Sequence, residues 1–104
     1  MNSKLLMIDR TWTLFLDRDG VINKRMEGDY IRNWDQFEFL PGVKDALKEL
    51  TRMFGTIIVV SNQQGVGKGL ITETEVAAIH KRMADEIEKT GGKIDRSYHI
   101  RYPC

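Results

Sequence analysis

Apolar side chains along the chain fall into three short runs and two helical stripes. Residues 11–17, 56–60 and 94–100 are rich in apolar, β-branched and aromatic side chains, which predicts three strands. Residues 43–53 and 72–89 repeat apolar positions at helical spacing, which predicts two helices between the strands. The order strand, helix, strand, helix, strand indicates an α/β fold with a parallel sheet. The first two strands are apolar enough to predict burial on both faces.

The ends of the two helices carry local signals. Pro41 and Gly42 precede the first helix, and Gly55 suits the left-handed C′ position after it. Thr72 and Glu75 have the spacing of a capping box, which predicts that the second helix starts there. The run 90–92, Thr-Gly-Gly, predicts its end.

Composition narrows the class of protein. The chain has 104 residues, of which 41% are hydrophobic and 30% charged, so it is typical of one small globular domain or of part of a larger one. A formal net charge of +1 favours neither nucleic acid nor an anionic membrane as a partner. No apolar run approaches the roughly 18 residues of a membrane span. The single cysteine, Cys104, excludes an internal disulfide, and a cytoplasmic location is the default expectation.

The first candidate site is the pair Asp17 and Asp19, which follows the first strand directly and precedes Gly20. Ligands of open α/β sheets bind at the carboxyl ends of the strands. Two neighbouring carboxylates repel each other unless a cation such as Mg²⁺ relieves them. One carboxylate could attack phosphorus while the other transfers protons. The alternative is a solvated turn built from ordinary turn residues.

A second polar group follows the second strand. Ser61, Asn62 and Gln63 could hold phosphoryl oxygens or sugar hydroxyls, and the alternative is an ordinary polar loop. The glycine-rich run 65–69 that comes next matches neither a P-loop nor a dinucleotide fingerprint. Lys68 within it either lends positive charge to a ligand or is simply solvated.

Three further features allow a structural interpretation. The loop 23–35 would lie over the end of the first strand, where loops commonly carry binding residues. Its aromatic residues, with those just after it, could instead anchor the loop; they are Tyr30, Trp34, Phe37 and Phe39. His80 and His99 have no partner at ligand or base spacing, which favours structural roles for both.

Three blocks in order resemble the haloacid dehalogenase superfamily. They are residues 15–23 (FLDRDGVIN), 37–43 (FEFLPGV) and 59–69 (VVSNQQGVGKG). Within the superfamily they are similar to the branch that contains D-glycero-D-manno-heptose-1,7-bisphosphate 7-phosphatase and histidinol-phosphate phosphatase. The resemblance implies a Rossmann-like parallel sheet with helices on both faces. It also implies a Mg²⁺-dependent phosphatase of a small phosphorylated sugar, working as a monomer without a large cap domain.

The resemblance also implies roles for individual residues. Asp17 would be the nucleophile and a Mg²⁺ ligand, and Asp19 the general acid and base, with its backbone carbonyl on the metal. Ser61 would stabilise the transferring phosphoryl group. The substrate would be contacted by Asn62, Gln63 and Gln64 and by Gly28, Asp29 and Tyr30 of the loop.

Two departures from the branch qualify these expectations. Members of the branch often carry a Zn²⁺ loop that begins Cys-Pro-His, whereas residues 102–104 read Tyr-Pro-Cys, so only Cys104 is a candidate zinc ligand. The third-motif Lys and fourth-motif Asp of the superfamily would lie past residue 104. The resemblance therefore implies that residues 1–104 are an incomplete domain, inactive alone. The alternatives are a histidinol-phosphate phosphatase and a phospho-ligand binding module without catalysis.

Overall fold

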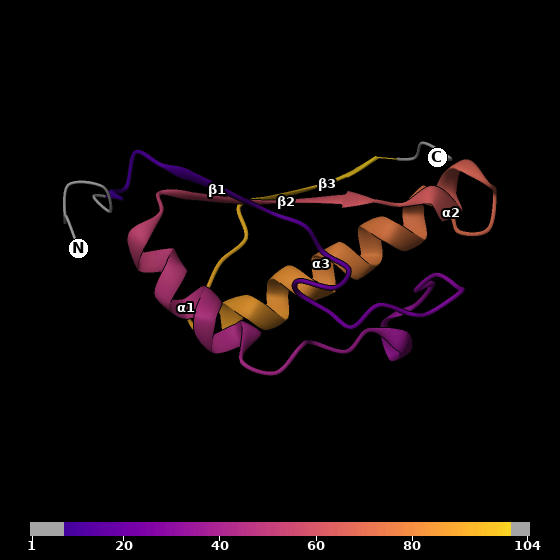
Figure 1. Ribbon diagram of the computed structural model, residues 1–104, viewed down its shortest axis with the longest axis horizontal. Helices are drawn as coiled ribbons and strands as arrows, with labels where there is room; N and C mark the ends of the chain where they lie inside the picture. The colour runs from indigo at the N-terminus through magenta and orange to yellow at the C-terminus, as the bar shows by residue number, and fades with distance from the viewer. Residues whose placement is uncertain (1–7, 101–104) are drawn as a thin grey trace.

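The computed structural model describes residues 8–100 as a small sheet with two long helices packed beneath it (Figure 1). The strands are β1 (Thr13–Leu16), β2 (Thr56–Asn62) and β3 (Arg96–Ile100). The helices are α1 (Val43–Met53), the short α2 (Gln64–Gly67) and α3 (Glu73–Lys89), with a 3₁₀ turn, η2, at Trp34–Gln36. Expectations for residues 1–7 and for Cys104 lie outside the described part of the chain.

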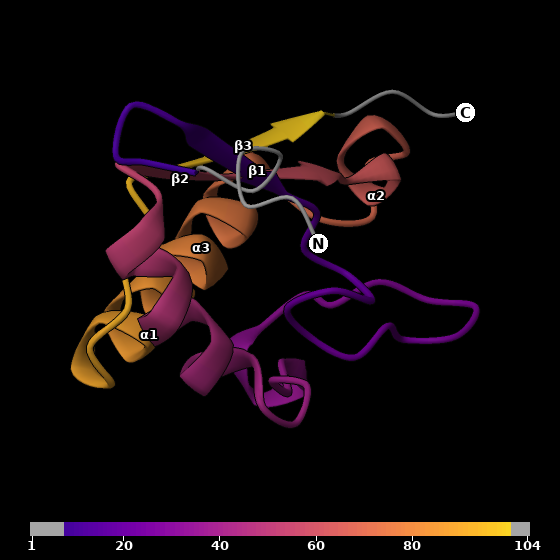
Figure 2. The ribbon, with the colours of Figure 1, turned by 60° about the vertical axis from the view of Figure 1, so that its left-hand side comes forward.

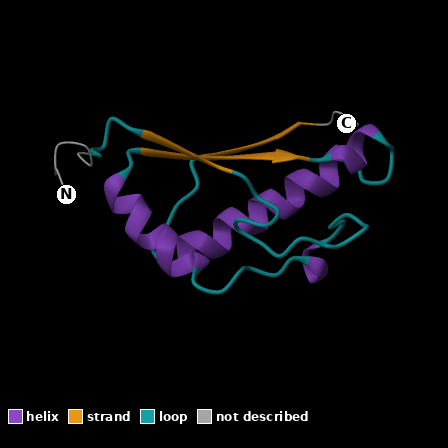
Figure 3. Cartoon of the chain, viewed as in Figure 1, coloured by secondary structure: helices purple, strands orange, loops and turns teal. Residues whose placement is uncertain are grey.

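The sheet is parallel throughout and has the order β1-β2-β3. Leu16 of β1 is in register with Val59 of β2, and Ser61 of β2 with His99 of β3. Each pair of neighbouring strands is joined through a long helix (Figure 3). The predicted parallel α/β arrangement is therefore confirmed, and the carboxyl ends of β1 and β2 lie at one edge of the sheet.

Both long helices lie on the same face of the sheet (Figure 2). The physical reason is that two successive right-handed crossovers, moving along the sheet in one direction, place their helices on one side. The prediction that β1 and β2 are buried on both faces is therefore wrong for the described residues, because no helix among them covers the second face. Ile57 and Val59 are fully buried, whereas Phe15 on the other face is 63% exposed.

The strands differ from their expected bounds for local reasons. β1 starts at Thr13 because Asp9 Oδ1 accepts hydrogen bonds from the backbone N and hydroxyl of Thr11, which holds residues 9–11 in a turn. At its other end Asp17 Oδ1 accepts the backbone N–H of Arg18, 2.8 Å away. β2 runs two residues longer than expected, because its last two residues pair with β3.

Both long helices begin where the sequence predicts. The capping box of α3 is confirmed, since Glu75 N donates to Thr72 Oγ1 at 3.1 Å and Thr72 N donates to Glu75 Oε1 at 2.8 Å. Gly91 follows α3 with φ +91°, as expected for a helix end. The left-handed C′ expectation for Gly55 is wrong; its backbone φ is not positive, and glycine is needed there because a Cβ would collide with the Arg10 carbonyl.

The helical stripe of α3 packs against the covered face of the sheet. Val76, Ile79, Met83 and Ile87 are all buried, as the spacing predicts. His80 lies beside them and is also buried, at 6% exposure. In residues 8–100, no helix is both long and apolar enough to cross a membrane.

Candidate active site

The site lies at the sheet edge where β1 and β2 end side by side. Asp17 follows β1 at once, and Arg18 begins a turn that passes through Gly20, with φ +85°. The Arg18 carbonyl closes this turn by accepting the Val21 N–H at 3.1 Å. Ser61 and Asn62 are the last residues of β2, and Gln63 caps α2. The parallel register of the two strands therefore brings together the two polar groups that the sequence singled out.

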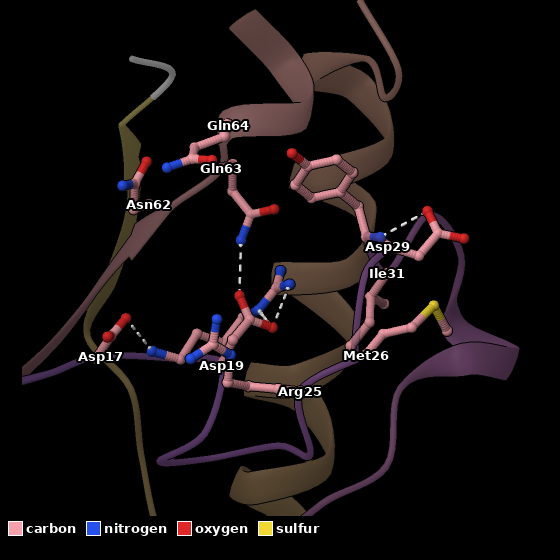
Figure 4. Close-up of a pocket in the computed structure, with 11 residues that line it drawn as sticks. Asp17, Asp19, Arg25, Met26, Asp29, Ile31, Asn62, Gln63 and Gln64 are labelled. Carbon is pink, nitrogen blue, oxygen red and sulfur yellow. Dashed lines mark hydrogen bonds and ion pairs between the residues drawn. The ribbon is translucent and has the colours of Figure 1, made fainter. Parts of the chain in front are cut away.

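Both carboxylate oxygens of Asp19 are held by hydrogen bonds (Figure 4). Oδ1 accepts from Arg18 Nη2 at 2.9 Å, from Arg18 Nε at 3.3 Å and from Asn23 Nδ2 at 3.0 Å. Oδ2 accepts from Gln63 Nε2 at 3.1 Å. Three donors on one oxygen fix the carboxylate, and they leave Oδ2 as its more lightly bound oxygen.

Ser61 is linked to this carboxylate through Gln63 and has no exposed surface. Its Oγ accepts a hydrogen bond from Gln63 Nε2 at 2.5 Å, so the Gln63 amide bridges Ser61 and Asp19. The strand alternation explains the position, because Ser61 continues the buried side of β2 after Ile57 and Val59. Ser61 is thus part of the constellation without lining its cavity.

A cavity of about 250 Å³ opens over the two strand ends. Its lining includes most of the expected residues, namely Asp17, Asp19, Asp29, Tyr30, Asn62, Gln63 and Gln64. Gly28 lies in an adjoining cavity that shares part of this lining. Lys68 does not line the main cavity and donates to the Tyr30 hydroxyl at 3.1 Å.

Four lining residues were not anticipated: Arg18, Arg25, Met26 and Ile31. The side chain of Arg25 packs over Gly20, in the turn that follows Asp17. The sequence signal that could have identified Arg18 as a lining residue is its position directly between two aspartates. For Arg25 the signal was weaker, because it is one of several basic residues in the chain.

His80, on α3, contacts Arg18 and is linked through it to the Asp19 carboxylate. Its Nε2 lies 3.2 Å from Arg18 Nη1. Because Arg18 can only donate, the imidazole accepts through Nε2 and is neutral. Burial, followed by the nearby charge of Arg18, lowers the pKa of His80 to about 4, which is consistent with this state.

Aromatic residues anchor the loop that covers the site. Trp34 stacks on Phe37 with ring centres 4.7 Å apart, and Phe37 meets Phe39 edge-on at 5.0 Å. Arg82 of α3 lies over the Trp34 ring, 5.1 Å from its centre. The anchoring interpretation therefore holds for these three aromatic residues, whereas Tyr30 lines the cavity.

The oxygen donors at the strand ends suit a hard divalent cation. Asp17 is exposed, and only its Oδ1 has a hydrogen-bond partner within residues 8–100. Two carboxylates would not enclose an ion alone, and the described residues hold no group of three or more acidic, His or Cys side chains that is placed to bind a metal ion. Mg²⁺ commonly binds through one or two carboxylates, with water and substrate phosphate completing its shell, so the donor set fits that ion.

Comparison with known proteins identifies several relatives of the chain. No protein-family model matches the chain. Over 84 residues, or 81% of the chain, it is 52% identical to the D-glycero-alpha-D-manno-heptose-1,7-bisphosphate 7-phosphatase of Mycobacterium tuberculosis strain H37Rv. Over 71 residues it is 48% identical to an uncharacterised protein of Methanocaldococcus jannaschii; that match covers 68% of this chain and 70% of the relative.

The fold is also similar to a solved structure. That structure is the D,D-heptose 1,7-bisphosphate phosphatase of B. bronchiseptica complexed with magnesium and phosphate. The TM-score is 0.79 at 30% identity, covering 88% of this chain and 51% of that one. The chain spans only 44% of the length of the mycobacterial relative.

Proposed function

We propose that the chain is part of a haloacid dehalogenase-like heptose bisphosphate phosphatase and that it carries the nucleophile and the acid-base residue of that enzyme. The observation that carries the proposal is the meeting of Asp17, Asp19 and Gln63 at one edge of the sheet, around a cavity of about 250 Å³. The substrate class is a small phosphorylated sugar, most specifically a heptose 1,7-bisphosphate that loses its 7-phosphate. A monomeric, cytoplasmic enzyme belongs to the same proposal.

In the first step, a carboxylate oxygen of Asp17 attacks the phosphorus. The new bond joins Asp17 to phosphorus, the bond from phosphorus to the sugar oxygen breaks, and its electron pair leaves with that oxygen. Asp19 donates a proton to the departing oxygen, so the sugar leaves as an alcohol. The exposed position of Asp17 beside the cavity supports its role, because a nucleophile must reach the substrate.

In the second step, water removes the phosphoryl group from Asp17. Asp19, now a carboxylate, takes a proton from the water as the water oxygen bonds to phosphorus. The bond between phosphorus and Asp17 breaks, which restores the carboxylate and releases inorganic phosphate. The same residue serves as acid and then as base because it gives up its proton in the first step.

Asp17, through its side chain, and Asp19, through its backbone carbonyl, would hold Mg²⁺. The bound ion would neutralise phosphoryl charge and align the group for attack. Ser61 would support the phosphoryl site through Gln63, to which it is hydrogen-bonded at 2.5 Å. Zn²⁺ at Cys104 stays a prediction, because that residue lies outside the described part of the chain.

Substrate choice would depend on the loop and on the start of α2. Asn62, Gln64, Asp29 and Tyr30 line the cavity beside the two aspartates and offer amide, carboxylate and hydroxyl groups to sugar hydroxyls. Gly28 borders the adjoining cavity, which could receive the distal part of a bisphosphate. The mycobacterial relative's name favours the alpha anomer as the substrate.

A substrate panel on the complete protein tests the proposal. Phosphate release is measured with both anomers of heptose 1,7-bisphosphate, with a heptose monophosphate and with histidinol phosphate. The alpha bisphosphate should give the highest kcat/KM. Preferential turnover of histidinol phosphate would contradict the heptose assignment, and sugar-phosphate binding without any turnover would favour a binding module instead.

A further inference from the structure

A buried path of polar contacts runs from the middle of α3 to the carboxylate of Asp19. His80 is 6% exposed, and its Nε2 lies 3.2 Å from Arg18 Nη1. Arg18 is 1% exposed, and it reaches Asp19 Oδ1 through two other nitrogens, at 2.9 and 3.3 Å. His80 lies 62 positions after Arg18, so this contact exists only in the folded chain.

A guanidinium buried this deeply needs acceptors for its N–H groups, because an unpaired buried charge is strongly destabilising. Asp19 satisfies two of the nitrogens and His80 the third. The Phe37 ring, 5.9 Å from the guanidinium carbon, adds a contact but no directional acceptor. His80 is therefore the group that fixes how the far end of the guanidinium is turned.

From this geometry we propose that His80 is a positioning residue: it orients Arg18, which in turn holds the Asp19 carboxylate with Oδ2 toward the cavity. The inference rests on the proposed function, in which Asp19 exchanges protons with the leaving oxygen and with water. His80 touches neither substrate nor metal in this scheme. Its effect reaches the chemistry only through the orientation of one carboxylate.

The orientation matters because the two oxygens of Asp19 differ. Oδ1 has three donors, whereas Oδ2 has the Gln63 amide alone. If Arg18 lost its acceptor on α3, the guanidinium could rotate and release Oδ1. The carboxylate would then be free to turn, and the oxygen aligned with the leaving group would be misplaced. Small displacements of catalytic groups are costly in rate.

A matched pair of variants separates positioning from packing. In His80→Gln, the side-chain amide oxygen reaches the place of Nε2 and can still accept from Arg18. In His80→Asn, the amide stops at the level of Nδ1 and falls short of Arg18. Met83→Ala serves as the packing control, because Met83 is a fully buried apolar residue one turn along the same helix. Thermal unfolding verifies that each variant of the complete protein folds.

The readout is kcat/KM for two substrates with different leaving groups. An alkyl phosphate such as the heptose bisphosphate needs a proton from Asp19, whereas p-nitrophenyl phosphate leaves as a stable phenolate without one. His80→Asn should lower kcat/KM for the alkyl phosphate by about tenfold or more, and for the aryl phosphate by less than about threefold. His80→Gln should stay within about threefold of wild type for both substrates.

Several results would overturn the inference alone, given an active wild type. One is an equal loss of kcat/KM for both substrates in His80→Asn, and another is no loss of kcat/KM in that variant. The third is a loss of kcat/KM in His80→Gln as large as that in His80→Asn. Met83→Ala should change the two kcat/KM values by the same factor, and a selective loss there would also count against the inference. A wild type inactive toward both phosphates would instead overturn the proposed function, and the role of His80 with it.

Discussion

Arg18 and Asp19 are neighbours in the sequence, and the guanidinium of the first folds back to bind the carboxylate of the second. Nη2 and Nε of Arg18 lie 2.9 and 3.3 Å from Oδ1 of Asp19. Arg18 is almost fully buried, whereas the Asp19 side chain keeps 28% of its surface exposed. The pair therefore joins the interior of the fold to the cavity, with the cation inside and the carboxylate at the surface.

The Gln63 amide should contribute to both stability and activity. In Gln63→Leu, the buried Ser61 hydroxyl and Asp19 Oδ2 would lose their shared donor. We expect the free energy of unfolding to fall by about 1–3 kcal/mol, the usual cost of unpaired buried polar groups, and kcat to fall as well. Urea unfolding and steady-state phosphate release measure the two effects.

Gln64→Leu is the matched control for that change. Gln64 lines the cavity as its neighbour does, but its side chain bridges no buried group within residues 8–100. Its replacement should raise KM with the free energy of unfolding changed by less than about 0.5 kcal/mol. An equal loss of unfolding free energy in both variants would show that the hydrogen bonds of Gln63 to Ser61 and Asp19 do not stabilise the fold.

His80 should make stability depend on pH in a defined window. Burial holds its pKa at about 4 in the folded chain, against 6.5 when unfolded, so between these values the unfolded state binds more protons. The contribution of neutral His80 is complete above pH 6.5 and is lost as the pH falls toward 4. With one pKa unit worth about 1.4 kcal/mol, the loss approaches about 3 kcal/mol.

The measurement is the free energy of unfolding of wild type minus that of His80→Gln, followed from pH 7 to pH 4. Carboxylates titrate in both proteins, so the difference isolates the imidazole. We expect the wild type to lose stability relative to His80→Gln as the pH falls from 6.5 toward 4. A difference that stays flat would mean that His80 is not held neutral by its surroundings.

Removal of divalent metal should abolish turnover. The two strand-end aspartates offer oxygen ligands that suit Mg²⁺, so chelation should stop phosphate release in the complete protein and added Mg²⁺ should restore it. Asp17→Asn should weaken Mg²⁺ binding by at least about tenfold in titration calorimetry. Asp85→Asn replaces an exposed carboxylate of α3 that pairs with Lys81, and it should leave binding unchanged. Full activity in chelator would contradict a metal-dependent mechanism.

Local patterns in the sequence predicted the features that local physics determines. The capping box of Thr72 and Glu75, the apolar stripe of α3 and the aspartates at the end of β1 all depend on residues a few positions apart. The short helix α2 was not expected, because a glycine-rich run of four residues has little helical propensity of its own.

Those local patterns could not predict contacts between residues that are far apart in the sequence. The contact of His80 with Arg18 joins residues 62 positions apart, whereas local spacing predicted only a structural role for His80 and no partner. The open face of the sheet depends on the direction of two crossovers, which strand composition does not reveal. The apolar first and second strands predicted burial on both sides, yet Phe15 of β1 is exposed on the uncovered face of the described residues.

The central claim is that Asp17 carries the phosphoryl group during turnover, and trapping that intermediate tests it most directly. The complete protein is quenched during turnover of the heptose bisphosphate, and the acyl phosphate is reduced with borohydride, which converts a phosphorylated aspartate to homoserine. Peptide mass spectrometry then locates the change. We predict homoserine at position 17 and none in Asp17→Asn. Homoserine at position 19, or turnover that persists in Asp17→Asn, would contradict the account.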